Sequence, residues 1–188
     1  MHTFSYKGKQ ITAISDTHGK HGLLRLPPCD VLIHLGDACD AGNDEELRDF
    51  FAWFSRQNAQ HKIFVAGNHD LPFDLFPEGA AKMLPENVLF MENSIVEIDD
   101  LVIASVKAVP WMQEIVEIDE PVDLLLSHGA PLGILDEGLG CPALKSLIDK
   151  CRPKYALFGH VHQATYASIR YNETECVNVC SCDLLRKS

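Results

Sequence analysis

The chain has 188 residues, 46% of them hydrophobic, which is typical of one globular domain spanning residues 1–188. Its net charge of −11 disfavours polymeric nucleic acid and anionic membranes as partners, because an acidic surface repels polyanions. The first residues have no signal-peptide pattern, and no apolar run reaches the roughly 20 residues that cross a bilayer. We therefore expect a cytoplasmic protein that contacts no membrane.

Short apolar runs bounded by polar residues or glycine predict buried strands. In chain order these runs occupy residues 10–15, 30–35, 62–67, 122–127, 154–159, 164–170 and 175–180. Apolar residues at helical spacing predict helices at 44–57, with Asn43 as the N-cap, and at 142–151, with Pro142 in the first turn. Residues 88–104 are expected to form short antiparallel strands. This mixture predicts an α/β fold with helices outside the sheets.

Metal-binding side chains follow five of the predicted strands, at the point where each strand ends. The segments are SDTHG (15–19), GDACD (36–40), GNHD (67–70), SHGAP (127–131) and GHVH (159–162). Ligand sites in α/β sheets lie outside the carboxyl ends of the strands, so we expect the five segments to converge. A single histidine at a strand end is usually structural, but five such groups in one chain point to a common site. Glycine beside the donors permits the tight turns that convergence needs.

The donor set of these segments is rich in imidazoles and carboxylates and contains too many ligands for one tetrahedral zinc ion. It suits two divalent transition-metal ions, for which we expect manganese, with iron, zinc or nickel as alternatives. Most of the seven cysteines are expected to be reduced, buried thiols. The group CVNVCSC (176–182) could be read as a metal cluster, but it lacks the Cys-x2-Cys pairs of structural zinc sites and is interpreted as strand residues with no metal role. His34 is interpreted as a core histidine. The role of His21 stays open, and Trp111 is equally compatible with stacking on a base and with ordinary packing.

The ordered set DTHG, GDACD, GNHD, SHGAP and GHVH resembles the calcineurin-like metallophosphoesterase superfamily. The longer stretches SHGAPLGILDEGLGCPAL, FGHVHQ and VNVCSCD are similar to the small metallophosphoesterase-domain proteins related to class III cyclic-nucleotide phosphodiesterases. The resemblance implies a two-sheet β-sandwich flanked by helices, a four-layer αββα fold, with a dimetal site at one edge.

The resemblance also assigns roles to individual residues. The first metal would be held by Asp16, His18 and His162, the second by Asn68, His128 and His160, with Asp37 bridging both. His69 would face the substrate rather than a metal, and Asp70 would orient it.

These roles imply a dimetal-dependent phosphoesterase in which a hydroxide between the two ions attacks phosphorus in line. The substrate expected is a small, nucleotide-type phosphodiester, because none of the five segments contains Arg or Lys to clamp a dianionic phosphate. A phosphomonoesterase acting on nucleotides or phosphoproteins is the alternative, and a non-catalytic metal-binding interaction scaffold is a less favoured one. The native metal pair, the physiological substrate and the oligomeric state are left open.

Overall fold

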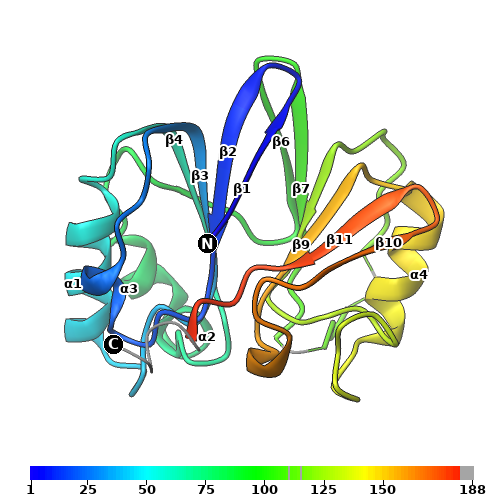
Figure 1. The fold of residues 1–188 in the computed structure, drawn as a ribbon. Coiled ribbons are helices and arrows are strands. Elements are labelled where there is room, and N and C mark those ends of the chain that lie inside the picture. The colour runs from blue at the N-terminus through cyan, green and yellow to red at the C-terminus, as the bar shows by residue number, and fades with distance from the viewer. Residues whose placement is uncertain (110, 115, 183–188) are drawn as a thin grey trace.

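The computed structural model describes residues 1–109, 111–114 and 116–182. Two sheets face each other between outer helices (Figure 1). The first sheet has the order β1-β2-β3-β4-β5, formed by β1 (His2–Tyr6), β2 (Lys9–Ile14), β3 (Cys29–Leu35), β4 (Ala59–Val65) and β5 (Leu89–Phe90). The second has the order β10-β11-β9-β8-β7-β6, formed by β6 (Ser94–Ile98), β7 (Leu101–Ser105), β8 (Leu124–Leu126), β9 (Tyr155–Phe158), β10 (Ser168–Tyr171) and β11 (Thr174–Asn178).

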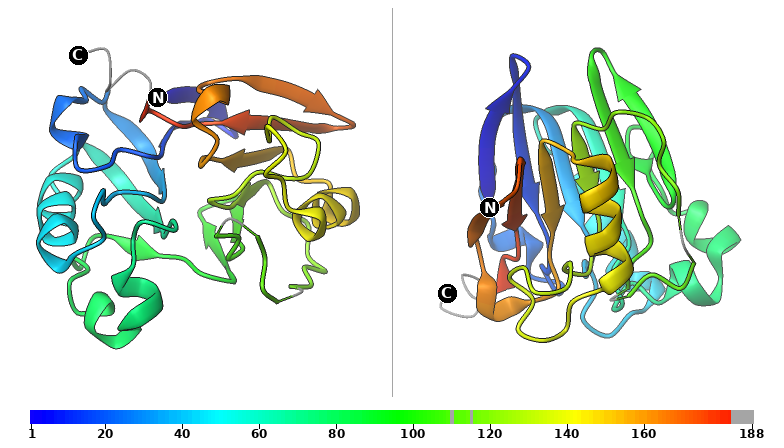
Figure 2. Two further views of the ribbon diagram at one scale, coloured as in Figure 1. Left: turned by 90° about the horizontal axis from the view of Figure 1, so that it is seen from below. Right: turned by 90° about the vertical axis from the view of Figure 1, so that its right-hand side faces the viewer.

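The helices α1 (Asp44–Phe54) and α4 (Pro142–Cys151) lie on the outer faces of the two sheets. Shorter elements are α2 (Pro72–Leu75), α3 (Pro77–Ala81) and the 3₁₀ turns η1 (His21–Leu23) and η2 (His162–Ala164). Figure 2 shows α1 and α4 on opposite sides of the sheet pair. The order of layers is therefore helix, sheet, sheet, helix, as the resemblance implied.

Three apolar cores join these layers. The central core lies between the sheets and includes Ile33 and Val65 from the first and Leu126 and Leu157 from the second. A phenylalanine-rich core packs α1 on the first sheet, and a third core packs α4 on the second. Strands buried on both faces cannot alternate between apolar and polar residues, which explains the continuous apolar runs in the sequence.

The parallel strands bring the ends of both sheets to one edge. Within the first sheet, β2, β3 and β4 are parallel, and within the second, β8, β9 and β11 are parallel. At this edge an isolated parallel bridge joins Ser15 to Cys180, and the amide of Ser181 donates to the carbonyl of Ser15 over 3.0 Å. The loops that follow the parallel strands therefore meet at the edge where the two sheets are joined.

Both predicted helices are present, although α1 ends at Phe54 instead of residue 57. Asn43 caps α1 by accepting a hydrogen bond from the amide of Glu46 over 3.0 Å. The first strand expected in the antiparallel group 88–104 was wrongly assigned, because β5 (Leu89–Phe90) joins the first sheet parallel to β4. The strand predicted at 164–170 starts at the last residue of the turn η2. In the structure the strand β10 begins only at Ser168. Among the described residues, no helix is both long and apolar enough to cross a membrane.

Candidate metal centre

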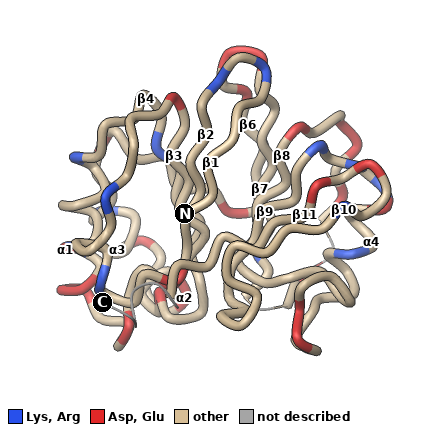
Figure 3. The backbone as a smooth tube through the Cα atoms, viewed as in Figure 1, with Lys and Arg blue, Asp and Glu red and all other residues tan. Residues whose placement is uncertain are grey.

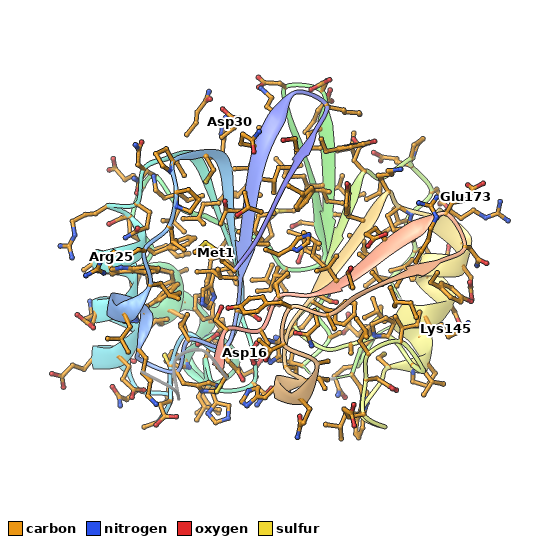
Figure 4. All side chains as sticks on the ribbon, in the orientation of Figure 1. Met1, Asp16, Arg25, Asp30, Lys145 and Glu173 are labelled. Carbon is orange, nitrogen blue, oxygen red and sulfur yellow. The ribbon has the colours of Figure 1, made fainter. Side chains whose placement is uncertain are left out.

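Loops from both sheets place the predicted ligands together at the joined edge. Figure 4 labels Asp16 at this edge, between the two halves of the molecule. The cluster contains all seven predicted ligands, which are Asp16, His18, Asp37, Asn68, His128, His160 and His162. Their convergence is a property of the structure, whereas their role as metal ligands stays a prediction.

The first group of donors comes from the loops after β2 and β9. The Nε2 atom of His162 lies 3.3 Å from Oδ1 of Asp16 and 3.4 Å from Nε2 of His18. Two ligands that each sit about 2.1 Å from one ion lie about 3.0–3.4 Å apart. His162 therefore lies at the spacing of a shared metal ion from each of the other two donors.

The second group comes from the loops after β4, β8 and β9. Nε2 of His128 lies 2.9 Å from Oδ1 of Asn68. Ligand atoms of Asp37, His128 and His160 lie within 4.8 Å of one another. This group fits a second ion.

Asp37 lies between the two groups. Its Oδ1 is 3.4 Å from Nε2 of His128, and its Oδ2 is 3.8 Å from Nε2 of His18. One carboxylate thus directs one oxygen to each group, which is the placement that a bridging ligand requires.

Backbone carbonyls orient two of the imidazoles. Nδ1 of His18 donates to the carbonyl of Cys39 over 3.1 Å, and Nδ1 of His128 donates to the carbonyl of Leu35 over 2.7 Å. A proton held on Nδ1 directs Nε2 toward the cluster, as in most metal-binding histidines, and a metal that binds there displaces any proton on Nε2. Both rings therefore present Nε2 to the cluster.

The backbone at the cluster is strained. Four of the seven predicted ligands have positive φ angles: Asp16 (55°), His18 (43°), Asp37 (55°) and His160 (64°). Such a conformation costs about 1–3 kcal/mol per residue and is concentrated at functional sites. The surrounding packing therefore holds these side chains in place at an energetic cost to the fold.

Glycine is required where the loops cross. A methyl group on Gly67 would collide with the Asp37 carboxylate, and one on Gly159 would collide with Ser15 and with the Asp16 carboxylate. Each glycine thus leaves room for a carboxylate that would otherwise be displaced. Sequence reasoning attributed these glycines to tight turns, whereas the structure shows close approach of neighbouring loops.

Burial and charge act in opposite directions on the ionisable groups of the cluster. Burial disfavours the charged form of His128, but the adjacent Asp37 and Asp16 carboxylates outweigh it and raise the pKa of His128 to about 10. Burial likewise acts to raise the pKa of Asp16, but the hydrogen bond with His162 and the charge of His128 together outweigh it and keep this pKa below its usual value. The carboxylates therefore remain ionised and concentrate negative charge where cations are expected to bind.

Asp70 does not orient His69, contrary to the role that the resemblance implied. The Nδ1 atom of His69 lies 2.8 Å from the backbone carbonyl of Asp40. The buried carboxylate of Asp70 instead accepts from the amides of Ala38 and Cys39 over 3.0 Å and from that of Gly67 over 2.8 Å. Asp70 therefore ties the loop after β3 to the loop after β4. Burial, followed by the charge of Asp37, raises the pKa of Asp70 to about 6.

Replacing Asp70 with asparagine is expected to lower the free energy of unfolding by about 1–3 kcal/mol, because the new amide group turns a donor toward one of the buried backbone amides. Urea denaturation of the metal-free protein measures this change. Asp74→Asn is the matched control, since that carboxylate is 44% exposed and pairs with Lys107, a contact worth at most about 1 kcal/mol. Equal stability of the two variants would contradict the role given to Asp70.

Asn178, at the end of β11, supports the loop of His160 and His162 and was not identified from the sequence. Its Nδ2 donates to the carbonyls of Gly159 over 3.3 Å and Val161 over 2.9 Å, and its Oδ1 accepts from the amide of Cys180 over 2.9 Å. The only sequence signal was a polar residue inside an otherwise apolar strand.

Asn178→Ala is expected to destabilise the fold by about 2 kcal/mol or more, because it leaves buried backbone groups unpaired. It should also weaken zinc binding, since it frees the loop that carries two predicted ligands. Thermal unfolding and zinc titration measure the two effects. The control Asn87→Ala removes one exposed hydrogen bond, to the carbonyl of Ser55, and should change neither.

His21 and His34 lie outside the cluster. His21 is buried between Phe50 and Trp53, and its Nε2 is 3.2 Å from Asp49, so it packs on α1. His34 is completely buried, which lowers its pKa to about 3, and its Nδ1 accepts from the amide of Gly36. The interpretation of His34 as a core histidine is confirmed.

Trp111 lies on the loop after β7 and is 49% exposed. Its Nε1 donates to the carbonyl of Leu139 over 2.9 Å and so joins two surface loops. The contact accounts for the indole nitrogen and leaves much of the ring facing solvent.

Fold and donors together define an α/β sandwich with a cluster of possible metal ligands at one edge. The chain belongs to the calcineurin-like phosphoesterase family, whose sequence model matches residues 9–164. This family generally binds a dinuclear metal centre, and membership indicates metal-dependent hydrolysis of phosphoesters.

Curated relatives come from several eukaryotes. The chain is 29% identical to human metallophosphoesterase domain-containing protein 1, over 92% of this chain and 66% of that protein. It is 30% identical to the UPF0046 protein C25E10.12 of Caenorhabditis elegans, over 93% and 75% of the two chains. The lariat debranching enzyme of Schizosaccharomyces pombe is 23% identical, over 73% of this chain and 41% of that enzyme.

Solved structures share the fold at lower identity. Phosphopantetheinyl hydrolase of Mycobacterium tuberculosis superposes with a TM-score of 0.64 at 16% identity, over 90% of this chain and 88% of that one. TT1561 of Thermus thermophilus gives 0.59 at 16% identity, over 89% and 87%. These similarities confirm the predicted fold class.

Proposed function

We propose that the protein is a dimetal-dependent phosphodiesterase that acts on a small, nucleotide-type phosphodiester. The placement of Asp37 carries this proposal, because its two oxygens face two separate groups of donors. Each group brings metal-binding side chains close together, and the two groups share this one buried carboxylate.

Two divalent ions at this centre would lower the pKa of a water between them and offset the charge on the phosphoryl oxygens. Around them, this chain supplies the positioning. The amide of His69 donates to Oδ1 of Asp37 over 2.8 Å, which fixes the backbone of the loop against the bridging carboxylate.

In this proposal, the His69 side chain acts on the leaving group. Its ring lies 4.8 Å from that of His18, centroid to centroid, and is partly exposed to solvent. Donation from Nδ1 to the Asp40 carbonyl leaves Nε2 available to a substrate oxygen. A protonated His69 would stabilise phosphoryl charge and donate a proton to the leaving oxygen.

Charge and exposed apolar surface support a small diester as the substrate. The five motif segments contain no Arg or Lys, and Figure 3 shows basic residues scattered among acidic ones along the described chain. Leu75 and Phe76, which follow the His69 loop in the chain, are 63% and 71% exposed. An exposed ring of this kind can stack on a base for about 1–3 kcal/mol.

The test is the hydrolysis of bis-p-nitrophenyl phosphate and p-nitrophenyl phosphate by metal-stripped protein, before and after manganese is added. Manganese-dependent cleavage that favours the diester is the expected result. A preference for the monoester would support a phosphomonoesterase instead. Bound metal without turnover of either compound would support an interaction scaffold.

A further inference from the structure

Two cysteines beyond β11 lie against the first group of donors. Ligand atoms of Asp16, His162 and Cys180 lie within 4.8 Å of one another, and the same is true of His18, His162 and Cys182. Both cysteines are buried. These two cysteines therefore lie where a metal ligand could lie, unlike the expectation that the cysteines have no metal role.

The joined edge of the sheets brings both cysteines to the cluster. Cys180 forms the isolated bridge with Ser15, next to Asp16, and the following amide, of Ser181, donates to the Ser15 carbonyl. These backbone contacts connect the segment after β11 to the loop that carries Asp16 and His18. Cys182 lies two residues further along the same anchored segment, beside two imidazoles.

The surroundings of the two thiols differ. Cys180 is completely buried, lies beside the negative charge of Asp16 and forms a hydrogen bond with the Thr165 side chain. Cys182 faces His18 and His162, whose Nε2 atoms are 3.4 Å apart and fit a shared ion. Cys182 therefore lies with both imidazoles of the first group, whereas Cys180 lies with one imidazole and a carboxylate.

We propose that the thiolate of Cys182 is an additional ligand of the metal ion held by Asp16, His18 and His162. The inference rests on the proposed dimetal centre. On binding, the S–H bond breaks, its proton goes to solvent and the sulfur electron pair forms the bond to the metal. Thiolate favours zinc, iron or cobalt over manganese. The centre would then hold two unlike ions, with the softer ion in the first site.

Cobalt substitution tests this ligand without any measurement of activity. Metal-stripped protein is titrated with Co²⁺, and its absorption spectrum is recorded from the near ultraviolet through the visible. Ligand-field bands report that cobalt is bound, whereas a thiolate-to-cobalt charge-transfer band in the near ultraviolet reports a Co–S bond. We expect both sets of bands in the unmodified protein.

Variants assign the Co–S bond to one sulfur. Cys182→Ser, and Cys182→Ala as a second replacement, should lose the charge-transfer band and keep the ligand-field bands. Cys180→Ser is the matched control, two residues away and beside the same histidine, and should keep the band. Cys182→Ser should lower the affinity for zinc at least about 10-fold more than it lowers the affinity for manganese. A loss of about 10-fold is the lower end of the range seen when a residue that supports a metal ligand is replaced.

Two results would overturn the proposal, and they differ from failure of the proposed function. Bound cobalt without a charge-transfer band in the unmodified protein would mean that the metal is present but has no sulfur ligand. A band that persists in Cys182→Ser would place the bond on another cysteine. If no cobalt binds, the result contradicts the proposed dimetal centre and, with it, the proposed thiolate ligand.

Discussion

Replacing Asp37 with asparagine is expected to remove most bound metal and to lower the hydrolysis of bis-p-nitrophenyl phosphate by about 10³-fold. Asparagine has nearly the same shape but carries no charge and offers one oxygen, so it cannot serve both groups of donors. Loss of about 4 kcal/mol of transition-state stabilisation corresponds to that factor. The variant should also have a lower pKa at His128, because the Asp37 carboxylate is the strongest influence that raises it.

Metal content per chain, measured by plasma mass spectrometry, and turnover are the two readouts. Asp30→Asn is the control, because Asp30 lies near the opposite end of the same strand, β3, and accepts from the amide of Gln10 over 2.7 Å. That control should retain both ions. An Asp37→Asn protein with two ions per chain and full turnover would contradict the bridging role.

The positions of the predicted ligands were accessible from the sequence because each follows a buried strand directly. A continuous apolar run predicts a strand covered on both faces, and the next residues must leave the sheet at its edge. Asp16, Asp37 and His128 all sit at such exits, so local pattern and topology agree. The alternating edge strand β1 was missed for the same reason, since it has no continuous apolar run.

Contacts between distant loops could not be predicted in this way. Asp70 follows His69 in the chain, yet its carboxylate turns to the amides of another loop. The His69 ring contacts a backbone carbonyl. Every residue has such a carbonyl, so the sequence does not indicate which one the ring contacts. Cys182 reaches the donors only because the bridge between Ser15 and Cys180 joins residues far apart in the chain.

His69→Ala is expected to retain bound metal and to lower turnover by about 10²–10⁴-fold, the usual contribution of a general acid. The backbone amide of residue 69 still donates to Asp37 in this variant, so the bridging carboxylate keeps that contact. The loss should be largest for diesters whose leaving group is a poor one, such as an alkoxide, because these depend most on proton donation. Diesters with nitrophenolate leaving groups should lose less.

Comparison of metal content and of rates across a series of leaving groups tests this role. His61→Ala is the control, because His61 lies on the same strand, β4, well before the loop of His69. A uniform loss for all leaving groups would assign His69 to phosphate binding alone. Loss of metal would make His69 a ligand, which is a real alternative because its ring nitrogen lies within 4.8 Å of the ligand atoms of His18 and Asp37. Retained metal with a loss that depends on the leaving group would establish His69 as the proton donor to the leaving oxygen.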